Sequence, residues 1–291
     1  MMQRRWLAIV NPACSGMRQR AFRETWLRRL RYGATKVVIC EKPGDAAHII
    51  AELHDFDGIA AVGGDGTVSD ILPALDPARH CLTVFPAGRG NSLARALGFA
   101  TMQQALTGLR QGVERTLDLM LLHARHADGK TTRAVCASTI AVGYVAAVAA
   151  RAQGKIGLHS YSRAAIATKP ELSRMQISYD GAPPESRSLT GLVINNIDHA
   201  AQFRVFPDAL LDDGYLHAME MNAPGLRQMG YNLAMLAGIR PKKSATRARS
   251  LRARSGKAFD LVADGEILTG VTEFSVDCVS SAIHCNRAAA D

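Results

Sequence analysis

The first hundred residues alternate between short apolar runs and stretches with helical spacing, and this alternation is the strongest constraint on the fold. The apolar runs cover residues 6–10, 36–40, 58–62 and 81–85, and the helical stretches cover residues 19–31, 45–53, 68–75 and 92–97. Strands that alternate with helices pair in parallel and are covered on both faces. This part is therefore predicted to form a doubly wound α/β domain, which binds ligands at the carboxyl ends of its strands.

After a further predicted helix at residues 102–111, the pattern changes to strand-like runs separated by turns. These runs cover residues 116–122, 133–137, 175–179, 189–195, 215–221, 258–263 and 273–278. Asp-Gly pairs at residues 128, 180 and 264 are typical of hairpin turns. Helical insertions are expected at residues 145–153 with 160–167, and at residues 225–237. We therefore predict a C-terminal antiparallel β-sandwich domain.

Length and composition agree with two folded domains. The chain has 291 residues, of which 47% are apolar and 21% charged, as in soluble globular proteins. The predicted domains are residues 1–117 and residues 118–291, with the last strand a candidate to return to the first domain. The net charge of +9 indicates an anionic partner, such as phosphate, nucleic acid or an acidic membrane. Nucleic acid is disfavoured because no aromatic residues interleave the basic ones.

The chain lacks the signals of a membrane-spanning or exported protein. The longest apolar stretch, residues 134–150, is interrupted by Ser138, Thr139 and Gly143, and the N-terminal apolar run has five residues. Six scattered cysteines form no C-x-x-C pair, so they are interpreted as reduced thiols. We expect a cytoplasmic protein, and a homodimer is left open.

Three of the four predicted N-terminal strands end in loops rich in glycine and small polar residues. The loops cover residues 10–16, 62–67 and 85–92, at one edge of the predicted sheet. Glycine lets the backbone come within hydrogen-bonding distance of phosphate oxygens. One such loop is equally well explained as a tight turn in which Asp65 or Thr67 caps the next helix. Three of them favour a nucleotide-binding domain.

Two common nucleotide-binding motifs are absent. Gly129-Lys130-Thr131 is similar to the end of a Walker A loop, but Ala124 stands where the first glycine belongs. Gly88-x-Gly90 lacks the third glycine of a dinucleotide-binding loop, because residue 93 is leucine. The first segment is predicted to be a hairpin turn, and a Rossmann dehydrogenase is disfavoured.

Five motifs occur in one order along nearly the whole chain. They are Asn11-Pro12 with Gly16, Gly63-Gly64-Asp65-Gly66-Thr67, Pro86-x-Gly88-x-Gly90-Asn91, Pro207-Asp208-Ala209-x-Leu211-x-Asp213-Gly214-x-Leu216, and Asp264-Gly265-Glu266. In this order and spacing they resemble the diacylglycerol kinase catalytic-domain family, in particular its bacterial soluble lipid kinases. The second motif alone is shared with NAD kinases and phosphofructokinases, so the resemblance rests on the whole set.

The resemblance implies a lipid kinase that uses ATP and Mg²⁺ and phosphorylates the hydroxyl of a diacylglycerol-like lipid in a cleft between the domains. Asp65 would lie near the transferred phosphoryl group and its Mg²⁺, and Glu266 would accept the proton of the lipid hydroxyl. Without the resemblance, Glu266 would be interpreted as a solvated charge on a turn. The nucleotide-binding residues would be Asn11, Cys40, Gly63, Gly64, Asp65, Gly66, Thr67, Val68, Ser69, Gly88, Arg89, Gly90 and Asn91.

The resemblance also implies a second Mg²⁺ away from the reacting groups. Asp213 would bind it through its carboxylate, and Leu210 and Tyr215 would bind it through their carbonyl oxygens. Oxygen ligands on a tight loop suit a hard cation. From the residues alone, a turn capped by Asp212 or Asp213 is the commoner explanation.

Several positions depart from the family pattern. Arg89 and Cys40 each stand where a threonine is common, and Ser138 and Val145 replace an asparagine and an aspartate. The last two changes fall on the side expected to face the acceptor. The identity of the acceptor is therefore less constrained than the fold.

The segment from residue 240 to residue 257 carries eight basic residues and no acidic one. Such a run is usually a solvated, mobile face. A lipid kinase without a membrane anchor must approach an anionic leaflet, however, where each basic residue contributes about 1 kcal/mol of attraction. We therefore expect peripheral contact with an anionic membrane surface, where the lipid substrate resides.

Two other functions remain open. The Gly-Gly-Asp-Gly-Thr loop and the two-domain layout also suit a kinase of a soluble metabolite, similar to NAD kinases. The substitutions at Cys40, Arg89, Ser138 and Val145 are compatible with a non-catalytic protein that binds lipid or nucleotide. The retained Asp65 and Glu266 favour the lipid kinase.

Overall fold

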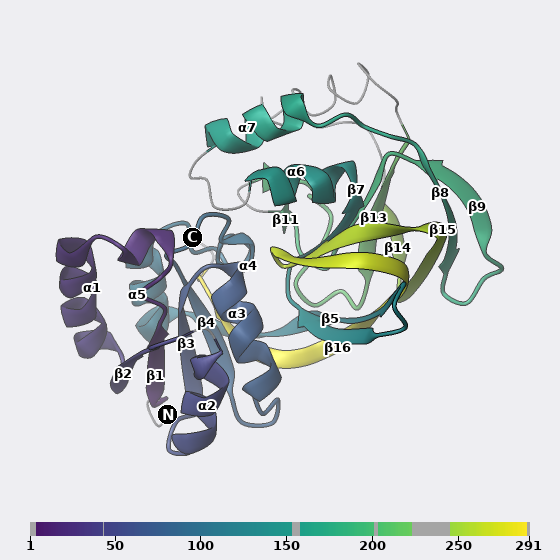
Figure 1. The fold of residues 1–291 in the computed structure, drawn as a ribbon. Coiled ribbons are helices and arrows are strands. Elements are labelled where there is room, and N and C mark those ends of the chain that lie inside the picture. The colour runs from purple at the N-terminus through teal and green to yellow at the C-terminus, as the bar shows by residue number, and fades with distance from the viewer. Residues whose placement is uncertain (1–3, 43, 153–157, 201–202, 223–244, 290–291) are drawn as a thin grey trace. The chain divides into compact units, whose positions relative to one another are not determined.

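The computed structural model describes residues 4–42, 44–152, 158–200, 203–222 and 245–289, and the chain divides into two compact units (Figure 1). Unit 1 consists of Met1–Asp118 and Ser281–Asp291, and unit 2 consists of Leu119–Ser280. Two long strands, β5 (Val113–His126) and β16 (Glu266–Arg287), contribute residues to both units. The end of the chain therefore returns to unit 1.

Unit 1 contains the expected parallel sheet, in the order β2, β1, β3, β4. Its strands are β1 (Trp6–Val10), β2 (Lys36–Ile39), β3 (Gly58–Gly63) and β4 (Cys81–Pro86). The end of β16 extends the sheet, because His284 and Cys285 pair in parallel with β4. Every residue of β1 and β3 is buried, which explains why both strands are continuous apolar runs.

The helices of unit 1 cover both faces of this sheet. They are α1 (Arg20–Gly33), α2 (Asp45–Glu52), α3 (Asp65–Ile71), α4 (Ser92–Ala96) and α5 (Met102–Gln111), with 3₁₀ turns at Ser15–Met17 and Leu72–Ala74. Helices α1 and α5 pack together on one side of the strands, and α2 and α3 pack together on the other (Figure 1). Helix α3 ends earlier than expected because Pro73 has no N–H to donate.

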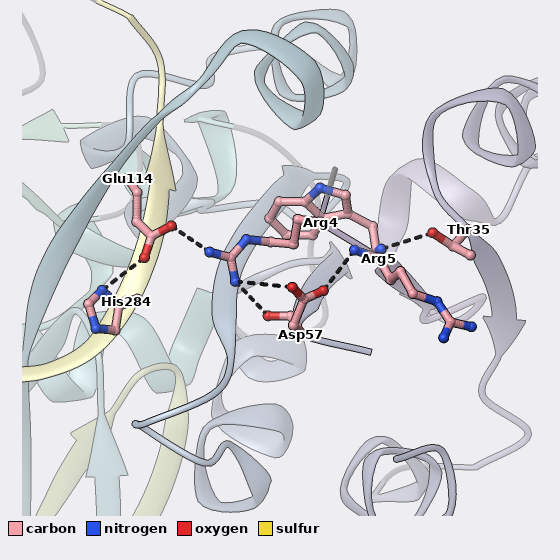
Figure 2. Close-up of polar contacts among 7 residues, drawn as sticks. Arg4, Arg5, Thr35, Asp57, Glu114 and His284 are labelled. Atoms are coloured by element: carbon pink, nitrogen blue, oxygen red, sulfur yellow. Dashed lines mark hydrogen bonds and ion pairs between the residues drawn. The ribbon is translucent and has the colours of Figure 1, made fainter. Parts of the chain in front are cut away.

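A polar network joins the beginning of the sheet to the returning end of the chain (Figure 2). Arg4 donates to the carbonyl oxygen of Asp57 over 2.9 Å and forms an ion pair with Glu114. Glu114 also contacts Nδ1 of His284 at 3.1 Å. The network ties the segments before β1 and β3 to β5 and β16, so segments far apart in sequence form one unit.

Unit 2 is built mainly of antiparallel strands, as expected for the β-rich part. Their order is β14, β13, β10, β7, β15, β16. In addition, β8 pairs with β15, β9 pairs with β8, and β6 pairs with β5. The strands are β6 (Thr131–Cys136), β7 (Thr139–Gly143), β8 (Ser173–Tyr179), β9 (Glu185–Leu189), β10 (Gly191–Asn195), β11 (His199–Ala200), β12 (Phe203–Arg204), β13 (Leu216–Met221), β14 (Thr246–Ala248) and β15 (Ser250–Ala263). Two helices, α6 (Tyr144–Ala152) and α7 (Leu158–Ala167), follow β7.

Strand β15 organises the core of unit 2. Residues 251–255 pair with β8, and residues 261–263 pair with β7. Register shifts on either side of Phe259 mark bulges, which bend the strand between these two pairings. The inward side chains of both parts share one apolar cluster that includes Ile140, Leu251 and Phe274.

Part of the basic segment forms strands rather than a mobile face. Residues 246–248 are β14, and residues 250–257 begin β15. Leu251 and Ala253 are buried, whereas Arg252 and Arg254 are exposed. This alternation is that of a half-buried strand. The expected helix at residues 225–237 and the basic residues Arg240, Lys242 and Lys243 lie outside the described residues. In the described part of the chain, no helix has the length and hydrophobicity needed to cross a membrane.

Candidate functional site

The three glycine-containing loops of unit 1 meet at the carboxyl ends of its strands. The N–H of Gly16 donates to the carbonyl of Ala87 over 2.8 Å, which joins the loops after β1 and β4. The N–H of Gly88 donates to the carbonyl of Gly63 over 3.0 Å, which joins the loops after β3 and β4. A Cβ atom on Gly88 would lie 2.3 Å from Cα of Gly64, so two backbones touch where no side chain fits.

Side chains beside this contact fix the loops. The amide of Asn11 donates to Oγ1 of Thr67 over 3.0 Å, and its carbonyl oxygen accepts the N–H of Ala13 over 2.9 Å. Gly63 makes room for this pair, because a Cβ there would lie 2.1 Å from Oγ1 of Thr67. The loop after β1 and the helix after β3 are therefore held together by their own side chains.

The loop after β4 is closed by Asn91. Its side-chain oxygen accepts the N–H of Gly88 over 2.8 Å, and its amide donates to the carbonyl of Gly88 over 2.9 Å. Asn91 adopts a left-handed conformation with φ of 56°, which asparagine tolerates better than most residues. Arg89 and Gly90 lie in the resulting turn, where Arg89 is exposed.

Asp65 is the first residue of α3 and is half-buried. The hydroxyl of the buried Ser92 donates to its carboxylate over 3.3 Å, and the hydroxyl of Ser69 donates to its backbone carbonyl over 3.2 Å. Gly66 is exposed, with open space around the position of a Cβ. A carboxylate and a bare stretch of backbone thus lie next to each other.

Val68 and Cys40 are less suited to ligand contact than the other predicted residues. Val68 is only 2% exposed, so its side chain belongs to the core and its backbone alone is available. Cys40 is also buried. Burial raises the pKa of the Cys40 thiol, and the neighbouring carboxylates of Asp45 and Asp70 raise it further. The thiol therefore stays neutral.

In unit 2, the buried carboxylate of Asp264 accepts four hydrogen bonds from one segment. Oδ2 accepts the N–H of Ala137 over 2.7 Å. Oδ1 accepts the N–H of Ser138 over 3.0 Å, its hydroxyl over 2.6 Å, and the N–H of Thr139 over 2.8 Å. Burial raises the pKa of the Asp264 carboxyl, although the four donors oppose the change. Asp264 thus anchors the turn after β15 to the turn between β6 and β7.

Glu266 is displayed by this anchored turn. Asp264 and Gly265 have φ values of 46° and 92°, as a tight two-residue hairpin turn requires. Glu266 is the first residue of β16, pairs with Ala263, and is exposed. A carboxylate is therefore held by a rigid turn while its side chain faces solvent.

Residues 5–122 match the model of the diacylglycerol kinase catalytic domain. Most of unit 1 and the first residues of unit 2 thus match this family's catalytic domain. A diacylglycerol kinase of Staphylococcus carnosus is 25% identical over 284 residues, which cover 91% of this chain and 89% of that protein. A diacylglycerol kinase of Staphylococcus aureus is 26% identical over 285 residues, which cover 91% of this chain and 87% of that protein.

A solved structure has the same fold. The crystal structure of a diacylglycerol kinase from Bacillus anthracis superposes with a TM-score of 0.75 and covers 99% of this chain and 98% of that one. The two sequences are 18% identical, so this likeness concerns the fold. The expected two-part architecture, α/β followed by β, is confirmed.

Two polar side chains missed by the sequence analysis lie next to the anchored turn. Thr139 and Asn195 are paired across β7 and β10. Oγ1 of Thr139 and Oδ1 of Asn195 are buried and have no hydrogen-bond partner among the described residues. A buried asparagine that ends an apolar strand was the available signal, because buried polar groups are seldom left without a role.

The Asp213 loop was the predicted place of a second Mg²⁺. The Asp213 carboxylate is nearly buried, and each of its oxygens accepts a hydrogen bond from protein. Oδ1 accepts the N–H of Tyr215 over 3.0 Å, and Oδ2 lies 2.9 Å from Nε2 of His217. Within the described part of the chain, no three His, Cys, Asp or Glu side chains are grouped as metal ligands. Protein N–H groups thus donate to both oxygens of this carboxylate.

Proposed function

We propose that this chain transfers the γ-phosphoryl group of ATP to the hydroxyl of a diacylglycerol-like lipid. That the chain is a lipid kinase rests on its similarity to diacylglycerol kinases. The choice of ATP, the acceptor and the residue roles are our proposal. It joins a nucleotide site in unit 1 with a base in unit 2 in a single reaction.

The approach of Gly64 to Gly88 is the observation that carries the nucleotide half. Phosphate oxygens accept hydrogen bonds from backbone N–H groups, and they reach them only where side chains are absent. The segments 63–69 and 88–91 supply such a surface, and Asn11 and Thr67 stiffen it. A kinase of this kind needs tight positioning of phosphates more than covalent chemistry.

Asp65 suits the Mg²⁺ that accompanies ATP. Mg²⁺ commonly binds one or two carboxylates together with substrate phosphates and water, so it needs no cage of protein ligands. The half-buried Asp65 carboxylate beside the glycine loops meets that requirement, and Ser92 orients it. Bound Mg²⁺ would neutralise charge on the transferred phosphoryl group.

We assign proton removal to Glu266. During transfer, the lipid oxygen forms a bond to the γ-phosphorus, the bond to the leaving ADP breaks, and the hydroxyl proton must leave. An exposed carboxylate on a fixed turn can accept that proton, and Asp264 keeps the turn in place. Thr139 donates its N–H to Asp264, and with its strand partner Asn195 it adds buried polar atoms near the same turn.

We propose that exposed arginines at the start of β15 help the enzyme to meet its substrate at an anionic membrane. Arg252 and Arg254 project from β15, and Arg249 precedes it. Each basic residue near such a surface contributes about 1 kcal/mol of attraction. This contact would be peripheral and dependent on salt.

The proposal is tested by supplying purified protein with ATP labelled at the γ-phosphate, Mg²⁺ and dioleoylglycerol in neutral detergent micelles. A parallel reaction contains NAD⁺ in place of the lipid. We expect label in the organic phase as a phosphorylated lipid, and none in NAD⁺. Label transferred to NAD⁺ would favour a soluble-metabolite kinase, and binding of ATP without any transfer would favour a non-catalytic protein.

A further inference from the structure

The Asp213 loop contains an arrangement that the family resemblance does not lead one to expect. The side chains of Asp213 and His217 are 7% and 2% exposed, so their contact at 2.9 Å lies out of water. A carboxylate oxygen accepts, so Nε2 of His217 carries the hydrogen of this bond. The N–H groups of Leu210 and Tyr215 also face the carboxylate, at 3.4 Å and 3.0 Å.

A fixed positive charge completes the arrangement. Arg247 forms an ion pair with Oδ2 of Asp213 at 3.7 Å. Its guanidinium lies over the ring of Tyr215, 4.3 Å from the centroid. Arg247 is also paired with His217 across β13 and β14. The sheet register and the aromatic ring therefore hold the arginine beside the carboxylate.

These contacts conflict with a divalent cation at Asp213. Mg²⁺ requires oxygen ligands with free lone pairs in a nearly octahedral set. Here an N–H group takes one lone pair of each carboxylate oxygen, and a guanidinium 3.7 Å from Oδ2 would repel a second positive charge. The residues present do not fit the metal that the family resemblance implies.

We propose that His217 and Arg247 replace the divalent cation, so that the Asp213 loop takes its shape from protein groups alone. The ion pair of Arg247 ties the loop before β13 to β14, and this guanidinium balances the charge of the Asp213 carboxylate. Mg²⁺ is then needed only with the nucleotide. This inference concerns the protein without nucleotide or lipid, so its failure would leave the proposed kinase activity untouched.

The test is thermal unfolding of the full chain without nucleotide, in EDTA and in MgCl₂ at matched ionic strength. We expect the same Tm in both solutions, because no divalent cation binds the loop. Arg247→Ser should lower Tm by about 2–4 °C in both solutions. The control Arg249→Ser should leave it unchanged, since Arg249 lies over the same ring but makes no ion pair with Asp213.

The proposal is wrong if Mg²⁺ raises the wild-type Tm and Asp213→Asn abolishes that rise. It is also wrong if Arg247→Ser and Arg249→Ser behave alike. A rise that persists in Asp213→Asn comes from another site and agrees with the proposal.

Should Asp213→Asn fail to fold, Mn²⁺ gives a second measurement on the wild type. We expect the methyl resonances of Leu211 and Leu216 to stay sharp, because no paramagnetic ion sits at Asp213. Selective broadening of both would refute the proposal.

Discussion

Replacing Asp264 with asparagine tests whether a buried carboxylate fixes the turn that carries Glu266. Asparagine has nearly the same shape and accepts the positive φ of 46°, so the backbone is not strained. Its oxygen can keep the three donors that Oδ1 now serves, from Ser138 and Thr139. Its NH₂ group, however, must face the N–H of Ala137, which now donates over 2.7 Å.

The expected cost can be built from these four bonds. Losing a hydrogen bond to a charged acceptor costs about 1.5–3 kcal/mol, and the three remaining bonds weaken by about 1 kcal/mol each when the charge is removed. Relief from holding a buried charge offsets part of this loss. We expect Asp264→Asn to lower the free energy of unfolding by about 3 kcal/mol.

The cost should also depend on pH. Burial raises the pKa of Asp264, so the folded chain binds a proton at this group more readily than the unfolded chain does. Stability from the group is then fully present below the ordinary carboxyl pKa of about 4 and is lost as pH rises through the raised value. Asparagine does not titrate. The difference in free energy of unfolding between wild type and Asp264→Asn should therefore be larger near pH 4 than near pH 7.

Urea unfolding followed by circular dichroism measures both effects. Asp260→Asn serves as the control, because Asp260 is an exposed acid on β15, just before the turn that holds Asp264. Kinase turnover should fall in Asp264→Asn, while the affinity for ATP stays unchanged. A loss of stability below about 1 kcal/mol would refute the anchoring role. A difference in stability that is the same at both pH values would refute the raised pKa of Asp264.

Other consequences can be tested with single sites or short groups. Gly64→Val should abolish ATP binding in calorimetry, because its Cβ would lie 3.0 Å from Cα of Gly88. The control Gly256→Val, at an open position, should bind ATP as the wild type does. Undiminished ATP affinity in Gly64→Val would place the nucleotide elsewhere. Asp65→Asn should weaken Mg²⁺-dependent turnover more than ATP binding, and equal Mg²⁺ dependence in both proteins would contradict its role. Reversal of Arg249, Arg252 and Arg254 to glutamate should reduce sedimentation with anionic vesicles at about 0.1 M salt and make no difference at about 1 M. Equal binding of wild type and variant at the lower salt would contradict a role of these arginines in membrane contact.

The α/β part of the fold could be predicted because its signals are local. Continuous apolar runs such as residues 58–62 form strands buried on both faces, and helical spacing separates them. The convergence of the loops at Gly16, Gly64 and Gly88 followed from parallel pairing alone. Ser92, which orients Asp65, was not among the predicted site residues, because its hydroxyl meets Asp65 only in the folded chain.

The β part was predicted less completely because its signals are ambiguous or distant. Strand β7 was missed because residues 139–143 lie within a longer run of small apolar residues. The start of β15 was missed because Arg252 and Arg254 concealed the alternation with Leu251. The anchor of Asp264 joins residues about 126 positions apart, and no local pattern reports such a contact.

The central claim is that the glycine loops of unit 1 and Glu266 of unit 2 serve one reaction. It is tested most directly by measuring label transfer from ATP to diacylglycerol and ATP affinity in wild type, Glu266→Gln and Glu273→Gln. Glu273 is an exposed carboxylate on the same strand β16. Because a general base contributes about 10²–10⁴-fold in rate, Glu266→Gln should lose turnover by that factor with ATP affinity intact, and Glu273→Gln should behave as wild type. Wild-type turnover in Glu266→Gln at saturating substrates would contradict the account.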